Sequence, residues 1–161
     1  MDETSLRELD DRLRDEVPGT AGWVNDPAEF ADYTFDELQF DPATYLVAVD
    51  DERHQFAGLV RIWANGNRSR LGLVGVARPY RRRGLARAML ASALRPVHAR
   101  GVHEVMAEVD ASNTASLACS GVSARSRPFL DGAEAPALRT DLTMSSEDGH
   151  SPSSKRLSFG Y

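Results

Sequence analysis

The sequence predicts one α/β domain (in the α+β sense) in which strands and helices are mixed along the chain. Apolar, β-prone segments at residues 45–49, 56–63 and 71–76 are separated by turn residues. A segment from about Gly84 to Arg100 follows the third of them directly, with apolar residues at helical spacing. The chain has 161 residues, of which 42% are hydrophobic and 27% are charged, which is enough for a single core.

Capping and turn residues predict two further helices near the N-terminus. Ser5 and Glu8 form a capping-box pattern, so a helix is expected to begin near Ser5 and to end before Pro18-Gly19. Asp26-Pro27 predicts a second, short helix that ends near Leu38. Aromatic residues gather around these helices and either line a pocket or belong to the core: Trp23, Phe30, Tyr33, Phe35 and Phe40.

The long helix and the elements after it are expected as follows. Pro96 should kink the helix or end its regular part, because proline cannot donate a backbone hydrogen bond. A strand is expected over residues 102–109. Asn113 is a favourable N-cap residue, so a short helix should begin there.

Charge is distributed unevenly along the chain, whose formal net charge is −5. Residues 1–52 hold sixteen Asp or Glu and three Arg, whereas residues 53–101 hold eleven Arg and no acidic residue. The division indicates two surfaces with opposite tasks, and an acidic surface would attract a cationic amine. The alternative is that the acidic residues only form the solvated faces of helices.

Several observations bear on the cellular compartment. The N-terminus is acidic and has no apolar segment, so it does not read as a signal peptide. No apolar run has the length needed to cross a bilayer, so no membrane partner is expected. Cys119 is the only cysteine, which excludes an internal disulfide and suits a reducing environment. We therefore expect a cytoplasmic protein.

The most informative stretch covers residues 74–86, where an apolar strand leads into a basic turn and then directly into the long helix. The first backbone N–H groups of a helix have no partner within it, and the helix dipole adds positive potential there. Arg81, Arg82 and Arg83 add cationic side chains. The pattern indicates a site for the phosphates of a ligand.

Two other interpretations of this basic cluster stay open, namely a solvated turn and a patch for nucleic acid. The negative net charge and the lack of any nearby aromatic residue except Tyr80 make nucleic acid the weaker interpretation. A dinucleotide-binding fold is weaker still, because the G-x-G-x-x-G spacing is absent.

Arg81-x-x-Gly84-x-Ala86 resembles the Q/R-x-x-G-x-G/A pyrophosphate loop of the GNAT (GCN5-related) N-acetyltransferases, and the resemblance extends over about residues 5–119. It implies a central mixed, mostly antiparallel sheet flanked by helices, with acetyl-CoA as the cosubstrate. The strand before the loop would bind the thioester and the pantetheine arm through backbone N–H groups, and Gly72 and Gly75 fit a bulge there. The coenzyme-binding residues expected in this segment are Val74, Gly75, Val76, Arg81, Arg82, Arg83, Gly84, Leu85 and Ala86.

A second string, Glu108-Val109-x-x-Ser112-Asn113, is similar to one in the ribosomal-protein N-terminal-alanine acetyltransferases. The resemblance makes Glu108 the general base, acting through water, and places Asn113 and Ser116 at the coenzyme. Strand alternation lets Glu108 face a cleft, where partial burial would raise its pKa; the alternative is an exposed strand residue. Other candidate bases, each of which could equally be a surface residue, are His54, His98 and His103.

The resemblance fails after Ala118. The family's general-acid tyrosine would fall at position 120, which is Ser120, a much weaker acid. Cys119 could accept an acyl group, but no base accompanies it in the sequence. We place the domain at residues 1–144, with one more strand within residues 137–144, and expect a disordered tail over residues 145–161. The chain from Cys119 onward is either the product of a reading-frame change or a divergent native lobe.

The sequence therefore favours an N-acetyltransferase that moves an acetyl group from acetyl-CoA directly to a primary amine. The acceptor, which could be cationic, would be a small molecule, a peptide N-terminus or a lysine, and we expect no metal site. Because the general-acid tyrosine is missing, a catalytically impaired acyl-CoA-binding or scaffold protein is the alternative. Homodimers are common in the family, so a homodimer is possible here too.

Overall fold

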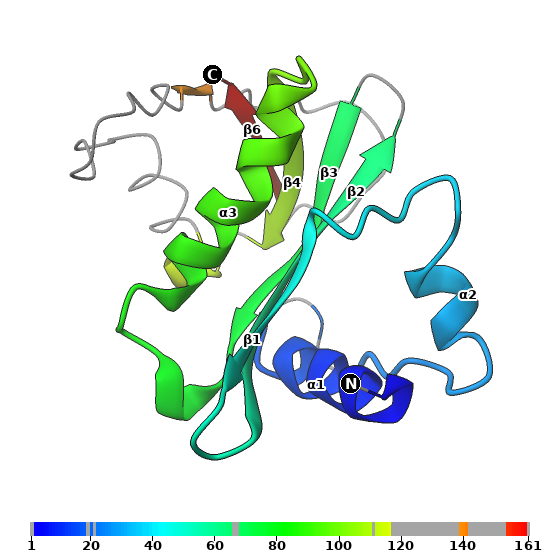
Figure 1. Ribbon diagram of the computed structural model, residues 1–161. Coiled ribbons are helices and arrows are strands. Elements are labelled where there is room, and N and C mark those ends of the chain that lie inside the picture. The colour runs from blue at the N-terminus through cyan, green and yellow to red at the C-terminus, as the bar shows by residue number, and fades with distance from the viewer. Residues whose placement is uncertain are drawn as a thin grey trace.

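The computed structural model describes residues 2–18, 20, 22–65, 68–110 and 112–116, followed by two separate strands. Figure 1 shows the elements in chain order. The helices are α1 (Glu3–Asp15), α2 (Phe30–Thr34), the short 3-10 helix η1 (Arg78–Tyr80) and α3 (Leu85–Ala99). The strands are β1 (Tyr45–Asp50), β2 (Gln55–Asn65), β3 (Arg68–Val76), β4 (Glu104–Asp110), β5 (Arg139–Asp141) and β6 (Ser154–Gly160).

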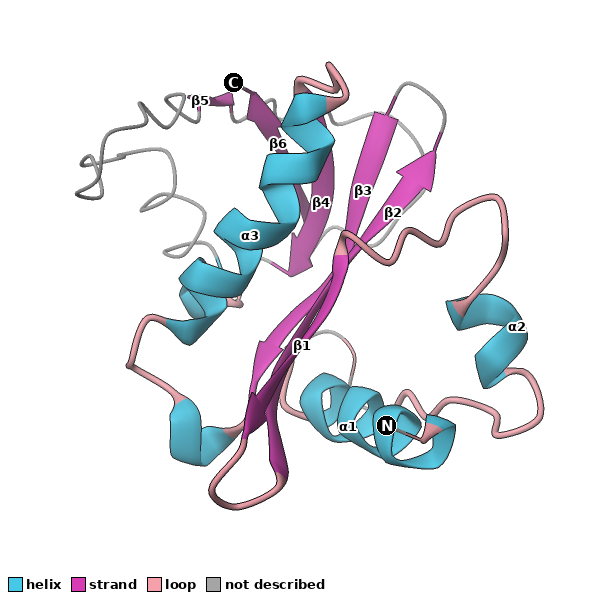
Figure 2. Cartoon of the chain, viewed as in Figure 1, coloured by secondary structure: helices cyan, strands magenta, loops and turns pink. Residues whose placement is uncertain are grey.

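The described strands form one sheet in the order β1-β2-β3-β4-β6-β5. Neighbouring strands are antiparallel except β3 and β4, which are parallel and are connected through α3. A parallel pair needs such a crossover, whereas β1, β2 and β3 follow one another directly. The predicted mixed, mostly antiparallel sheet flanked by helices is confirmed (Figure 2).

Helices α1 and α3 pack on opposite faces of the sheet, because successive residues of a strand point to opposite sides. On β2, Val60 belongs to the core under α3, and its neighbour Leu59 belongs to the core under α1. The amphipathic stripe of α3 contributes Leu90 and Leu94, and α1 contributes Leu9. Each helix therefore buries one apolar stripe against one face of the sheet (Figure 1).

Helix α1 begins earlier than the capping-box pattern predicts. Asp2, not Ser5, is the N-cap: its side chain accepts hydrogen bonds from the Ser5 backbone N–H (2.9 Å) and hydroxyl (2.8 Å). Asp is at least as good an N-cap as Ser, so the helix gains its first turn. Helix α1 then ends at Asp15, before Pro18 as expected.

Helix α2 is shorter than predicted, because two aspartates start two separate turns. The Asp26 carboxylate accepts from the Ala28 backbone N–H (2.8 Å), and the Asp36 carboxylate accepts from the Leu38 N–H (3.0 Å). Aspartate side chains favour such turns over continued helix. The helix is therefore confined to Phe30–Thr34.

Pro96 does not end α3, which continues to Ala99. The residue lies in the last turn and a half, so the helix loses one backbone hydrogen bond near its end rather than at its centre. The apolar face continues through this point, since Val97 is 3% exposed.

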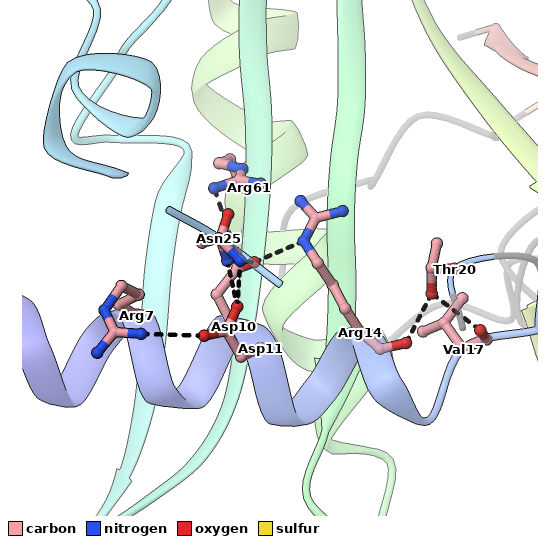
Figure 3. Close-up of polar contacts among 8 residues, drawn as sticks. All are labelled: Arg7, Asp10, Asp11, Arg14, Val17, Thr20, Asn25 and Arg61. Atoms are coloured by element: carbon pink, nitrogen blue, oxygen red, sulfur yellow. Dashed lines mark hydrogen bonds and ion pairs between the residues drawn. The ribbon is translucent and has the colours of Figure 1, made fainter. Parts of the chain in front are cut away.

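A buried polar cluster joins α1 to the sheet (Figure 3). Asp10 is fully buried, and its carboxylate lies 2.5 Å from Arg14 Nε and 3.3 Å from Arg61 Nη1 of β2. Asn25 donates a further hydrogen bond to Asp10 (3.0 Å). The Arg61 guanidinium carbon lies 4.6 Å from the centre of the Trp63 ring. The cluster thus fixes α1 through charge as well as through apolar packing.

Two strands occupy the C-terminal region. Strand β5 falls inside the segment expected to contain a strand. The expectation of a disordered tail is wrong for residues 154–160, which form β6 and pair with β4 along its whole length. The edge of β4 supplies backbone partners that no local sequence pattern reveals. The remaining residues beyond 116, including Cys119 and Ser120, lie outside the described residues.

Candidate functional site

Strands β3 and β4 pair over only part of their length. Residues 69–71 of β3 lie in register with residues 105–107 of β4, after which the strands continue to Val76 and Asp110 without pairing to each other. A cleft of about 460 Å³ opens near this end, between β3, the C-terminal end of α1, the start of α3 and the segment after β4. The separation leaves one backbone edge of residues 72–76 without a strand partner among the described residues.

Almost all of the residues predicted to hold the coenzyme line this cleft. Arg83 is the exception, and its guanidinium carbon lies 6.0 Å from the centre of the Tyr80 ring, beside the cleft. The predicted residues that line the cleft are Val74, Gly75, Val76, Arg81, Arg82, Gly84, Leu85, Ala86, Asn113 and Ser116.

The loop before α3 has an unusual backbone. Arg82 and Gly84 both adopt positive φ angles, of 64° and 79°. Gly84 is the N-cap of α3 without a side-chain hydrogen bond, and a Cβ built there would meet nothing within 4 Å. Glycine is therefore favoured by its φ angle and not by crowding.

The loop also presents unused backbone donors. The first helical hydrogen bond of α3 runs from the Ala88 N–H to the Gly84 carbonyl (3.0 Å). Within the described ranges, the backbone N–H groups of residues 82–87 donate to no backbone acceptor. Alternating left-handed residues and a helix N-terminus form an anion-binding concavity. The loop geometry is compatible with an anion such as a phosphate, and the phosphate site stays a prediction.

Side chains around the loop differ in what they bind. Arg81 is engaged by the protein itself: its Nε donates to the Val76 carbonyl (2.8 Å), and its Nη2 contacts the Glu16 carboxylate. Arg82 and Arg83 are exposed. Neither of them forms an ion pair within the part of the chain that the structure describes, so their charges face the solvent.

The bulge expected at the glycines of β3 is confirmed at Gly72. Leu71 pairs with Ile62 and Leu73 pairs with Arg61, so Gly72 is the extra residue. A Cβ at Gly72 would lie 2.4 Å from Trp63 Nε1, so no larger residue fits without movement of the indole. The bulge directs Leu73 towards α1 and Val74 towards α3.

Gly75 lies inside the cleft lining and under α1. A Cβ there would come within 3.1 Å of the Leu13 side chain. Leu13 is 2% exposed and belongs to the core under α1, so it has little room to retreat. The close approach of helix and strand at this point brings the C-terminal end of α1 to the cleft.

The candidate base Glu108 lies on β4. Of the two alternatives that the sequence leaves open, partial burial in a cleft and exposure on the strand, the structure shows the second, because the Glu108 side chain is exposed. Its neighbour Ala107 packs under α3, so Glu108 projects from the opposite face of the sheet, the face that α1 covers elsewhere. Glu108 is not among the residues that line the cleft. Any water that it activates would have to lie on the α1 face.

Asn113 has the N-cap role that the sequence predicts, and its contact with the coenzyme stays a prediction. It is 7% exposed, and its Oδ1 accepts a hydrogen bond from the Ser116 backbone N–H (3.0 Å), which confirms the N-cap. Both residues line the cleft. The short helix therefore begins beside the expected position of the coenzyme arm.

The other candidate bases lie away from the cleft lining. His98 and His103 are near the C-terminal end of α3, with ring centres 6.0 Å apart. His54 is exposed in the turn between β1 and β2 and lines a second hollow of about 650 Å³. This hollow shares Glu16 and Tyr80 with the cleft but contains none of residues 81–87. It therefore lacks residues 81–86, the loop predicted to bind phosphates, which we call the phosphate loop.

The aromatic residues near α2 differ in burial, and none of them lines either the cleft or the second hollow. Phe30 is 2% exposed and belongs to the core under α1. Phe35 and Phe40 form an edge-to-face pair with ring centres 5.1 Å apart. Trp23 and Tyr33 are largely exposed, at 57% and 71%. Phe30 is therefore a core residue, whereas the role of these two exposed side chains at an acceptor pocket stays a prediction.

Comparison with known proteins assigns the family. The model of the acetyltransferase (GNAT) family matches residues 6–120, which is more than half of the chain. The chain therefore belongs to the GNAT family. No protein of curated function matches the sequence closely enough to identify a nearer relative. No helix within the described ranges is long and apolar enough to cross a membrane.

Solved structures confirm the fold at low sequence identity. Ard1 from Thermoplasma volcanium has a TM-score of 0.65 at 13% identity, covering 100% of this chain and 95% of its own. The ribosomal-protein-S18-alanine N-acetyltransferase from Escherichia coli has a TM-score of 0.59 at 15% identity, with 99% and 88% covered. Diaminobutyrate acetyltransferase EctA from Paenibacillus lautus, in complex with its substrate and coenzyme A, has a TM-score of 0.60 at 17% identity, with 98% and 87% covered.

Proposed function

We propose that this protein transfers an acetyl group from acetyl-CoA to a primary amine. The observation that carries the proposal is that the backbone N–H groups of residues 82–87, at a cleft of about 460 Å³, donate to no backbone acceptor in the part of the chain that the structure describes. These groups suit the diphosphate of a coenzyme. The presence of coenzyme A in the structures of EctA and of the paiA N-acetyltransferase from Thermoplasma acidophilum supports the same ligand.

The coenzyme would follow the cleft from the loop to the unpaired edge of β3. Arg82 and Arg83 would meet the diphosphate along with the loop N–H groups. Backbone N–H groups of residues 73–76 would bind the pantetheine arm and polarise the thioester carbonyl, and Asn113 and Ser116 would contact the arm. The bulge at Gly72 lies at the point where β3 leaves β4, and so determines the direction of this edge.

Direct transfer requires a neutral amine. Its nitrogen would attack the thioester carbon, forming the C–N bond as the C–S bond breaks. Glu108 would remove the amine proton through a water molecule on the exposed α1 face of β4. The thiolate must then take up a proton; Ser120 stands at the position of the family's general acid, outside the described residues, and solvent can supply the same proton.

The acceptor class follows from chemistry that the neighbours share. The solved structures include one enzyme named for an alanine of ribosomal protein S18 and one named for diaminobutyrate, and both of these acceptors carry an amine. Eleven Asp or Glu and no Lys or Arg lie between Arg14 and Arg53, which favours a cationic acceptor. A cytoplasmic location and a possible homodimer remain part of the proposal.

The experiment is a free-thiol assay with acetyl-CoA and a panel of amines, preceded by a thermal-shift measurement. Acetyl-CoA should raise the Tm, because it binds the folded state selectively. Glu108→Gln should lower kcat by about 100-fold or more while it changes the KM for acetyl-CoA by less than about twofold. Glu104→Gln, an exposed residue on the same face of β4, is the matched control and should leave both unchanged. No Tm change at millimolar acetyl-CoA would contradict the proposal.

A coenzyme-binding protein without transferase activity is the second candidate. It is favoured by the exposure of Glu108 and by the absence of any tyrosine between Tyr80 and Tyr161 in the sequence. A Tm increase with acetyl-CoA, without thiol release for any amine, would select this candidate.

A further inference from the structure

Glu16, the residue that follows α1 as its C-cap, contacts two arginines next to the phosphate loop. One carboxylate oxygen lies 3.1 Å from Arg78 Nε, and the other contacts Arg81 Nη2. The Glu16 side chain is only 17% exposed. The Arg81 side chain is 41% exposed and the Arg78 side chain is 77% exposed, so water screens the pair with Arg81 less than the pair with Arg78.

Arg81 connects three parts of the site. Its Nη2 contacts Glu16 at the end of α1, its Nε donates to the carbonyl of Val76 at the end of β3, and its backbone begins the loop. The next residue, Arg82, has a φ of 64°, a left-handed conformation that is unfavourable for a residue with a side chain. Such a conformation persists only when its surroundings hold it in place.

We propose that Glu16 is a positioning residue for coenzyme binding. It fixes Arg81 and, through Arg81, holds the backbone of residues 82–86 in the shape that directs its N–H groups at a diphosphate. The inference rests on the proposed function, since it assigns Glu16 a role only for a coenzyme in this cleft. Glu16 also neutralises much of the charge of Arg81 and leaves Arg82 and Arg83 as the cations for the phosphates.

The direction in which coenzyme affinity changes when Glu16 is replaced distinguishes a positioning role from a purely electrostatic one. Glu16 lines the cleft, and a carboxylate near a diphosphate weakens its binding through charge repulsion. If charge were its only influence, replacing Glu16 with a neutral residue would tighten coenzyme binding. A positioning role predicts the opposite, because the loop would lose the contact that fixes Arg81.

The test compares Glu16→Gln with Glu8→Gln, a matched change at an exposed position of the same helix. Calorimetry would measure the Kd of coenzyme A and of pantetheine, which has no diphosphate. Glu16→Gln should raise the Kd of coenzyme A about three- to tenfold, the range expected for losing partly exposed ion pairs. Its Kd for pantetheine, and both Kd values of Glu8→Gln, should stay within about twofold of the wild type.

Three results would contradict the inference or the proposed function. Unchanged or tighter coenzyme A binding by Glu16→Gln would overturn the inference and leave the proposed function intact. An equal loss for pantetheine would show general damage to the cleft and would also overturn it. Failure of the wild type to bind coenzyme A would remove the proposed function itself. If Glu16→Gln does not fold, Glu16→Asp replaces it in the test, because it keeps the charge but shortens the side chain. Glu16→Asp should also weaken coenzyme A binding and leave pantetheine binding unchanged, and the same results would contradict the inference.

Discussion

Gly84 determines the shape of the phosphate loop through its backbone alone. Its φ of 79° is unfavourable for any residue with a Cβ, although an added Cβ would meet no atom within 4 Å. We therefore expect Gly84→Ala to lower the free energy of unfolding by about 1 kcal/mol, through backbone strain without steric clash. The strained loop should also bind acetyl-CoA more weakly, which calorimetry would measure.

Gly101 provides the control for this substitution. Its φ is 77°, a Cβ there would also meet nothing within 4 Å, and it lies just after the C-terminal end of α3. Gly101→Ala should cost a similar free energy of unfolding and leave the Kd of acetyl-CoA unchanged. Equal effects of the two substitutions on the Kd would argue that the loop shape is not used for binding.

Tyr45 contributes to folding stability in a way that depends on pH. Its hydroxyl is buried and has no hydrogen-bond partner in the described part of the chain, and burial raises its pKa from 10.0 to about 12. Because the folded state holds this proton more tightly than the unfolded state, the resulting stability is present below pH 10 and is lost as the pH rises towards 12.

Tyr45→Phe should therefore abolish the part of the alkaline loss of folding stability that this residue causes. At pH 7 the variant should be as stable as the wild type or more stable by up to about 1 kcal/mol, since it removes an unpaired buried hydroxyl. Urea unfolding at pH 7 and pH 11 measures both effects. A loss of more than about 1 kcal/mol at pH 7 would mean that the hydroxyl is paired after all.

At the scale of elements, α1 depends on the carboxylate of Asp10. Asp10 is fully buried between Arg14 and Arg61, and the Arg61 side chain is 6% exposed. Asp10→Ala would leave a buried guanidinium without its carboxylate, so we expect a loss of about 3 kcal/mol in the free energy of unfolding. Urea unfolding would measure the loss, and Glu8→Ala on the exposed face should change the same quantity by less than about 0.5 kcal/mol. A comparably small effect of Asp10→Ala would show that apolar packing alone holds the helix.

The sequence predicted elements well wherever the signal was local and periodic. The strands at residues 45–49, 56–63 and 71–76 all formed, as did the long helix, because alternation and helical spacing reflect burial directly. The helix after Asp26 was predicted too long, since Asp36 starts a competing turn. Strand β6 was missed because its partner, β4, lies more than forty residues earlier in the chain.

At the scale of the whole molecule, part of the charge division along the chain is neutralised within the fold, where acidic and basic residues form ion pairs. Within the described ranges, three acidic residues of the first third form long-range ion pairs with the basic middle: Asp10 with Arg61, Asp41 with Arg100, and Glu16 with both Arg78 and Arg81. Sequence analysis expected two surfaces with opposite tasks. The structure adds that several of these charges face each other between elements.

The candidate site was predictable in its contiguous part only. The stretch from Val74 to Ala86 contains the end of a strand, a loop and the start of a helix, so the shape of the proposed phosphate loop could be inferred without coordinates. The contact of Glu16 with Arg81 could not, because 65 residues separate the two in sequence and only folding brings them together. The exposure of Glu108 could not be predicted either, because strand alternation indicates on which face of the sheet a residue lies but not whether another element covers that face.

The most direct test of the phosphate loop is the change in backbone amide chemical shifts when coenzyme A is added to the isotope-labelled protein. The largest changes should fall on residues 82–87, and the same titration with pantetheine should leave these amides nearly unchanged. Unperturbed loop amides at saturating coenzyme A, or changes confined to a distant surface, would contradict the assignment of this loop as the coenzyme site.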